Sequence, residues 1–151
     1  MARFYLDSSA LVKRYHVESG SAKVDALFDA AGNRFFISRL ALVESHSSFA
    51  RLVREGVLTE AGFKTVISRL ESDVAANTLV VAAVSSPRLD DATALLATHG
   101  LKNNLRALDA IHLATAQALH SRTKLSAFVA ADKRLLALAN AACGLAVLDV
   151  G

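Results

Sequence analysis

The chain of 151 residues has the length of one ordinary domain, and its 53% apolar and 21% charged residues exclude a disordered protein. A net charge of +3 and a pI of about 9.3 permit contact with polyanions, but the basic residues form no dense run and give weak support for nucleic-acid binding. The mean hydropathy of +0.36 is high, yet no apolar stretch is long enough to span a bilayer, so no membrane association is expected.

The composition of the first residues and the single cysteine favour a cytoplasmic protein. Arg3 is followed by Asp7 and two serines rather than by a long apolar stretch, so no signal peptide is expected. The one cysteine, Cys143, cannot form an internal disulfide, which suits a reducing compartment. Because no repeat, low-complexity tract or linker interrupts the chain, we predict one domain over residues 1–151.

The predicted elements alternate between strands and helices. In chain order we expect a strand at 3–6, a helix capped by Ser8 or Ser9 through Tyr15, a helix at 21–31, a strand at 34–37, a helix from Ser38 through Arg54, a helix from Thr59 to about 76, a strand at 79–84, a helix from Pro87 to Gly100, a helix at 105–121, a strand at 127–130, a helix at 133–142 and a strand at 145–150. The strands are continuous apolar runs, which is typical of a parallel sheet covered on both faces. The sequence therefore predicts a three-layer α/β/α domain, with the strand order left open.

Asp109 carries the strongest functional signal. It lies in residues 105–116, a stretch with helical periodicity and almost no other charge, and shares a face with Leu105, His112 and Leu113. Burying an ionised carboxylate among leucines costs on the order of several kcal/mol unless a cation or hydrogen-bond donors compensate it. We therefore expect that Asp109 has a partner or that this end of the helix opens onto water.

Two further carboxylates, Asp7 and Asp132, each follow an apolar strand directly. Ligands of open α/β sheets bind beyond the carboxyl ends of the strands, so both lie at one rim, which Asp109 can reach. Three carboxylates near one point repel each other, and a hard divalent cation, Mg²⁺ best of all, is the usual compensation. The alternative is helix capping, which explains Asp132 taken alone equally well, whereas Ser8 or Ser9 fills that role better than Asp7.

Glu44 and His112 are ambiguous from periodicity. The apolar stripe of the helix at 39–54 runs through Leu42, Val43, Phe49, Ala50 and Val53. Glu44 falls nearly opposite this stripe, so periodicity alone indicates a solvated glutamate. His112, one turn beyond Asp109, could hydrogen-bond it or bind a metal, but a lone histidine on an apolar face is more often a satisfied core residue, and it stays outside the predicted metal set. The other histidines show no ligand spacing.

Four segments together resemble the PIN domain family, and specifically the VapC-type toxin ribonucleases, over essentially the whole chain. They are residues 4–15, 42–51, 108–116 and 129–135, which contain Asp7, Glu44, Asp109 and Asp132 in turn. Each segment alone is a weak signal, but four in order and at suitable separations form a strong one. One position departs from the family, which often has Thr or Ser two residues before the fourth acid, where this chain has Ala130. A missing hydroxyl there weakens the expected support of Asp132, with Ser8 or Ser9 as a partial replacement.

The resemblance implies a Mg²⁺- or Mn²⁺-dependent endoribonuclease. Asp7, Asp109 and Asp132 would hold one or two ions, with Glu44 bound directly or through water, and metal-activated water would cleave RNA to leave a 5′-phosphate and a 3′-hydroxyl. The family also implies a homodimer and a small VapB-type antitoxin whose C-terminal segment covers the acidic groove. The helices between residues 40 and 76 are possible docking surfaces, although apolar stripes there are more often core.

Four basic residues lie near the same rim in sequence and are candidates for contact with RNA phosphates: Lys13, Arg14, Lys133 and Arg134. For each taken singly, solvated surface charge is the better interpretation.

Two other classes of function compete with the nuclease. A haloacid-dehalogenase-type phosphatase requires a second Asp two residues after the first, where this chain has Ser9, and a receiver requires an Asp after a middle strand, where Ile37 is followed by Ser38. The stronger rival is a non-catalytic PIN-like module that binds RNA or a protein. Ala130 supports this rival, but retention of all four acids argues against it.

Overall fold

The computed structural model describes residues 1–151 and confirms an α/β domain. Its strands are β1 (Arg3–Leu6), β2 (Arg34–Ser38), β3 (Leu79–Ala82), β4 (Ala127–Ala130) and β5 (Val147–Asp149). Its helices are α1 (Ser8–Leu11), the short 3₁₀ helix η1 (Val12–Arg14), α2 (Ser21–Asp29), α3 (Arg39–Arg54), α4 (Glu60–Ala75), α5 (Ser86–Asn103), α6 (Ala107–Thr123) and α7 (Lys133–Cys143).

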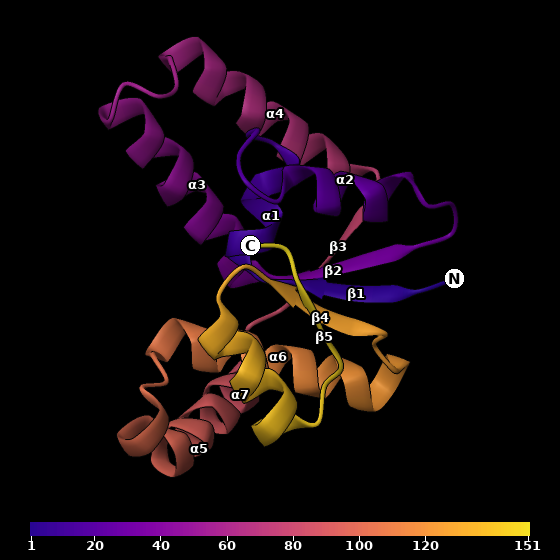
Figure 1. Ribbon diagram of the computed structural model, residues 1–151, viewed down its shortest axis with the longest axis vertical. Coiled ribbons are helices and arrows are strands. Elements are labelled where there is room, and N and C mark those ends of the chain that lie inside the picture. The colour runs from indigo at the N-terminus through magenta and orange to yellow at the C-terminus, as the bar shows by residue number, and fades with distance from the viewer.

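All neighbouring strands pair in parallel, in the order β3-β2-β1-β4-β5, so β1 is central. Helices α1 to α4 cover one face of the sheet and α5 to α7 cover the other, which gives the three layers predicted from the sequence (Figure 1). No helix combines the length and the apolar character that crossing a membrane would need.

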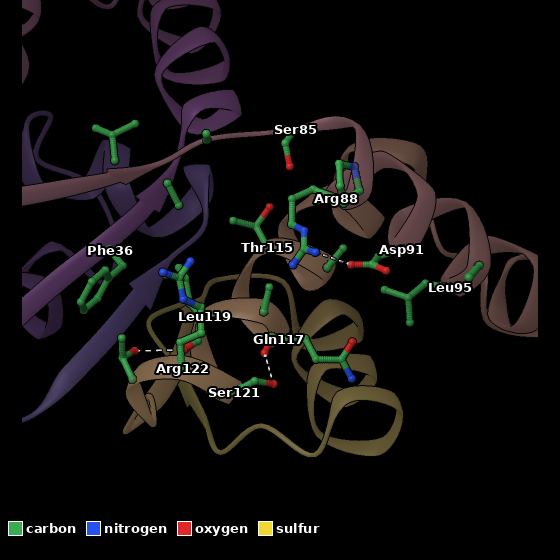
Figure 2. A pocket seen from close by; sticks show the side chains of 18 of the residues that line it. Phe36, Ser85, Arg88, Asp91, Leu95, Thr115, Gln117, Leu119, Ser121 and Arg122 are labelled. Carbon is green, nitrogen blue, oxygen red and sulfur yellow. Dashed lines mark hydrogen bonds and ion pairs between the residues drawn. The ribbon is translucent and has the colours of Figure 1, made fainter.

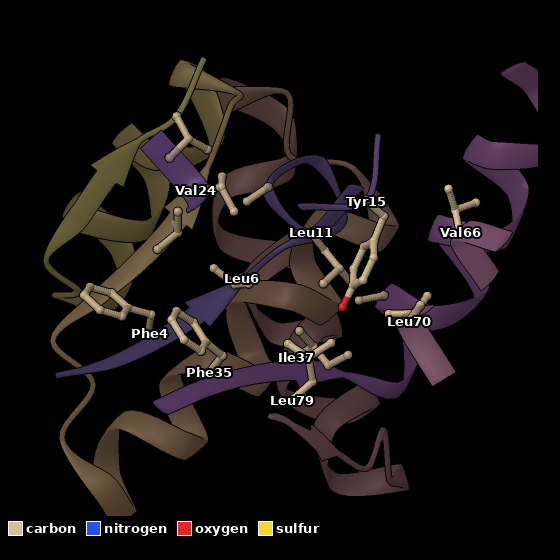
Figure 3. Close-up of a cluster of buried hydrophobic side chains, with 14 of the residues drawn as sticks. Phe4, Leu6, Leu11, Tyr15, Val24, Phe35, Ile37, Val66, Leu70 and Leu79 are labelled. Carbon is tan, nitrogen blue, oxygen red and sulfur yellow. The ribbon is translucent and has the colours of Figure 1, made fainter. Parts of the chain in front are cut away.

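The sheet separates two hydrophobic clusters, and successive residues of β1 contribute to opposite ones. Phe4 and Leu6 join the cluster under α1 to α4, which also contains Phe35 and Ile37 of β2 (Figure 3). Tyr5 joins the cluster under α5 to α7. Side chains of a strand point alternately to its two faces, so the continuous apolar run in β1 supplies both layers. The position of Tyr5 becomes important at the functional site.

Several predicted boundaries were wrong by a few residues. Gly100 does not end a helix, because α5 continues to Asn103 and ends at Asn104 in the left-handed conformation (φ 49°). A glycine inside a helix weakens it by about 1 kcal/mol relative to alanine but does not interrupt its hydrogen bonds. Helix α6 begins at Ala107 rather than 105, and α1 gives way to η1 after Leu11. Strands β3 and β5 are shorter than expected.

The buried face of α3 also differs from the expected stripe. Its buried residues are Ala41, Ser45 and Phe49, spaced four apart, whereas Val43 is 66% exposed. The hydrophobic pattern was misleading because a small serine occupies the centre of the buried face and a valine faces solvent. In the true orientation of the helix, Glu44 is partly buried and contacts His112 of α6.

Candidate functional site

Asp7, at the end of β1, is a buried carboxylate with hydrogen-bond donors but no cation. It is 4% exposed, and its Oδ1 accepts from the backbone N–H of Ala10 at 2.9 Å. The Ser9 hydroxyl lies 2.7 Å from Oδ1 and 2.9 Å from Oδ2. Burial raises the pKa of Asp7 to about 6, although His112, Ser9 and the Ala10 N–H each act to lower it. A buried anion of this kind is an energetic cost that a bound cation would relieve.

The prediction that Ser8 or Ser9 caps the first helix was wrong, because Asp7 is itself the N-cap of α1. Ser9 instead supports the carboxylate: its Oγ donates to Asp7 and accepts from the backbone N–H of Ala131 at 3.0 Å. Ser9 thus links Asp7 to the end of β4, next to Asp132. The Ser9 hydroxyl therefore lies next to the end of β4, where Ala130 itself supplies no hydroxyl.

Asp109 and Asp132 share one guanidinium. Arg134 Nη2 lies 3.2 Å from Asp109 Oδ2 and 3.3 Å from Asp132 Oδ2, and Nη1 donates to the carbonyl of Asn104. Asp109 is in the first turn of α6 with its side chain 23% exposed, so it has both a partner and contact with water, as the sequence indicated. Burial raises the pKa of Asp109, although Arg134 opposes this effect.

Asp132 caps the N-terminus of α7, as one interpretation of the sequence predicted, and also lies at the rim of the sheet. Its Oδ1 accepts from the backbone N–H groups of Arg134 and Leu135 at 2.9 and 3.2 Å, which makes it the N-cap of α7, while Oδ2 faces the Arg134 side chain. Although burial opposes them, hydrogen bonds from the Leu135 N–H and from Arg134 hold the pKa of Asp132 below its ordinary value. Capping and a further role are therefore compatible in this residue.

Glu44 forms a hydrogen bond with the buried imidazole of His112. The imidazole is 1% exposed, its Nε2 lies 2.5 Å from Glu44 Oε1, and its Nδ1 lies 2.9 Å from the hydroxyl of Tyr5. The Glu44 side chain is only 21% exposed, so the solvated glutamate indicated by periodicity was wrong. His112 does not hydrogen-bond Asp109, the protein partner considered from the sequence, because its two ring nitrogens contact Tyr5 and Glu44. Glu44 raises and His112 lowers the pKa of Asp7, which places all three within electrostatic range.

The structure therefore brings the four predicted acids to one end of the sheet, but as two groups. One contains Asp7, Glu44 and His112, and the other contains Asp109, Asp132 and Arg134. No three acidic, histidine or cysteine side chains lie close enough together to hold a metal ion between them, and Arg134 takes the cation's place beside Asp109 and Asp132. The donor set nevertheless fits a hard divalent cation, because it consists of carboxylates and includes a buried anion, Asp7, without a counter-ion.

The basic residues predicted near the rim are mostly committed to internal contacts. Lys13 is buried, in contrast to the solvated charge expected, and its Nζ lies 3.0 Å from Glu18 Oε1. Arg14 pairs with Asp25 at 2.8 Å and lies over the ring of Phe28. Lys133 is exposed and has no salt-bridge partner. Of the four candidates, only Lys133 matches the solvated charge expected from the sequence.

A groove of about 980 Å³ lies away from the four acids, between α5, α6 and the edge strand β3. Figure 2 shows lining residues that include Arg88 and Asp91 of α5 and Thr115 and Arg122 of α6. A smaller pocket of about 270 Å³ adjoins the acids through Ser9 and Ala131. Its other polar lining residues include Ser8 of α1, His16 after η1, and Ser48 and Arg51 of α3.

Sequence reasoning missed the structural roles of Tyr5 and Arg134. A tyrosine in a buried strand requires a partner for its hydroxyl, and this signal was available at Tyr5. The pairing of Arg134 with Asp109 was not, since it joins residues 25 positions apart on two helices whose relative placement the sequence did not fix.

Comparisons with known proteins place these features in context. A model of the PIN domain matches residues 4–141. Ribonuclease VapC35 of Mycobacterium tuberculosis, from strain CDC 1551 / Oshkosh and from strain H37Rv, is 34% identical over 148 residues, which cover 97% of this chain and 96% of the relative.

Solved structures with the same fold are more distant in sequence. PAE2754 from Pyrobaculum aerophilum has a TM-score of 0.64 and 19% identity, with 99% of this chain and 84% of that chain covered. FitAcB from Neisseria gonorrhoeae has a TM-score of 0.62 and 19% identity, with 97% of each chain covered. FitAB bound to an IR36 DNA fragment gives a TM-score of 0.64 at 18% identity, with 97% and 94% covered.

Proposed function

The chain belongs to the PIN domain family, and we propose on that basis that it is an endoribonuclease, the toxin of a toxin–antitoxin pair, which hydrolyses RNA phosphodiester bonds with a divalent metal ion. The observation that carries this proposal is the buried carboxylate of Asp7, which has no counter-ion and lies within electrostatic range of Glu44. Asp7 is at the end of the sheet where ligands of open α/β folds bind. The similarity to Ribonuclease VapC35 over nearly the full length of both chains supports the same activity.

We assign the metal site to Asp7, Glu44, Asp109 and Asp132, with Mg²⁺ or Mn²⁺ as the ion. When bound, such an ion lowers the pKa of a coordinated water and offsets charge on the phosphate. The chain's own residues prepare the site: Ser9 holds both oxygens of Asp7, and the N–H groups at the start of α7 fix Asp132. The single positive charge of Arg134 offsets part of the charge of Asp109 and Asp132 in this conformation and would compete with a metal for their Oδ2 atoms.

The small pocket beside Ser9 is a suitable place for the RNA backbone. The hydroxyls of Ser8 and Ser48 and the imidazole of His16 make no side-chain hydrogen bond within the protein, and Arg51 makes only a 3.9 Å ion pair with Glu55. These groups leave donors free for phosphate or ribose oxygens next to the acids.

The proposal includes a homodimer, a VapB-type antitoxin as partner and a cytoplasmic location. The relatives support a toxin–antitoxin context through the VapC name and the FitAB structure. In Figure 1 the hairpin of α3 and α4 extends away from the sheet, and it exposes Val43 and Val57. This hairpin is our candidate for the antitoxin surface.

Incubation of structured total RNA with the purified protein and Mg²⁺ or Mn²⁺ tests the activity. We expect discrete cuts that disappear with EDTA and with Asp7→Asn or Asp109→Asn, each of which removes one charged metal ligand and lowers the rate by about 100-fold or more. Asp90→Asn is the matched control, because Asp90 is exposed on α5 and has no salt-bridge partner. Intact RNA, together with no Mn²⁺ binding by the unaltered protein, would favour the non-catalytic binding module instead.

A further inference from the structure

A hydrogen-bonded chain of three side chains connects the centre of the sheet to Glu44. Tyr5 is the middle of β1, His112 is in the second turn of α6, and Glu44 is in α3, on the opposite side of the sheet from α6. The Tyr5 hydroxyl lies 2.9 Å from His112 Nδ1, and His112 Nε2 lies 2.5 Å from Glu44 Oε1. Tyr5 and His112 are buried, whereas Glu44 is partly exposed at the rim.

The carboxylate at the end of the chain determines the direction of the hydrogen bond that it receives. A carboxylate can only accept, so His112 Nε2 carries the hydrogen in the contact with Glu44. The Tyr5 hydroxyl can donate to Nδ1 of a neutral imidazole or accept from Nδ1 when both ring nitrogens carry hydrogen. Each polar atom of the buried pair is satisfied by this arrangement, and each defines the orientation of the next.

We propose that His112 is a positioning residue, held by Tyr5, which fixes the Glu44 carboxylate at the metal site beside Asp7. Glutamate has three rotatable side-chain bonds and loses conformational entropy when it binds an ion. A buried donor that already holds one oxygen removes part of that loss, and Glu44 Oε2 has no protein partner and stays available. Partners behind metal ligands orient them in this way and contribute about 10- to 100-fold to metal affinity.

A purely structural role for His112 does not explain why its partner is partly exposed. A core histidine could be satisfied by a buried backbone carbonyl, whereas this one ends on a charged side chain at the rim. His112 also lies within electrostatic range of both Asp7 and Asp109.

The inference rests on the proposed metal-dependent function, and two variants of the full chain separate the two ideas. His112→Gln can place an amide N–H near the position of Nε2 and keep the bond to Glu44, whereas His112→Asn can reach only toward Tyr5. Mn²⁺ affinity is measured by calorimetry, and thermal unfolding in EDTA reports separately on the fold. We expect His112→Asn to weaken Mn²⁺ binding by about 10- to 100-fold and His112→Gln to retain most of the affinity.

Equal Mn²⁺ affinity in His112→Asn and the unaltered protein would overturn the positioning role and leave the proposed function intact. Absence of Mn²⁺ binding by the unaltered protein would overturn both. The ¹⁵N NMR spectrum of the histidine rings tests the hydrogen-bond pattern in the unaltered protein. The His112 signals are identified by their loss in His112→Gln. Hydrogen on Nε2 supports the inference, and hydrogen on Nδ1 alone would contradict it.

Discussion

Asp7, which directly follows β1, is buried and makes no ion pair with an arginine or lysine. Asp109 and Asp132 are more exposed and share the guanidinium of Arg134. Burial raises the pKa of Asp7 to about 6, and backbone N–H groups with Arg134 hold the pKa of Asp132 below its ordinary value despite partial burial. Burial thus disfavours the ionised form of Asp7, whereas hydrogen bonds and Arg134 favour the ionised form of Asp132. In the proposed metal site, Asp7 would supply a charge that no ion pair offsets, and the ion would compete with Arg134 for Asp109 and Asp132.

The largest effect is expected in the pH dependence of the free energy of unfolding, measured in EDTA. Because the folded state raises the pKa of Asp7 from 3.8 to about 6, the folded protein binds the proton more tightly than the unfolded chain. Stability from this group is therefore full below pH 4 and falls by roughly 3 kcal/mol in all as the pH rises through 6.

Asp7→Asn removes this titrating group. Urea unfolding at pH 4, 5, 6 and 7.5 should show a smaller fall in the free energy of unfolding for Asp7→Asn than for the unaltered protein. The exposed control Asp90→Asn should keep the full fall. If Asp7→Asn follows the unaltered protein across this range, Asp7 is not the uncompensated charge.

A smaller effect is expected from Ser9→Ala, which removes a donor to both oxygens of Asp7 and the acceptor for the Ala131 N–H. Hydrogen bonds to charged groups contribute about 1.5 to 3 kcal/mol, so urea unfolding at pH 7.5 should show a loss of that order. The loss should shrink at pH 4.5, where Asp7 is protonated. Ser8→Ala is the matched control, since Ser8 makes no side-chain hydrogen bond, and equal losses in the two variants would contradict the assignment.

The smallest change in stability is expected from Arg134→Gln. The pairs with Asp109 and Asp132 are partly exposed, so their loss should cost about 1 kcal/mol or less. Removing a cation from the site should nevertheless tighten Mn²⁺ binding severalfold, and the pKa of Asp109 should rise further without Arg134 beside it. Calorimetry on Arg134→Gln and on the exposed control Lys133→Gln measures this difference. Weaker or unchanged binding in Arg134→Gln would show that Arg134 does not compete with the metal.

The sequence by itself determined the layers and the rim. Continuous apolar strands between helices indicated a parallel sheet covered on both faces, and that alone placed Asp7 and Asp132 at the same edge, because they follow parallel strands directly. The unusual charge on the α6 face marked Asp109. These features depend on local order along the chain, which periodicity and strand ends report directly.

Only the tertiary structure decided which side chain meets which. Glu44 and His112 are 68 residues apart, and their contact depends on the rotation of α3 about its axis, which the pattern misjudged because Ser45 faces the core and Val43 faces solvent. The sharing of Arg134 by Asp109 and Asp132 depends on how the ends of α6 and α7 approach each other. Periodicity assigns residues to faces but carries no information on the relative placement of separate elements, and that placement fixed the partners of every acid except the caps.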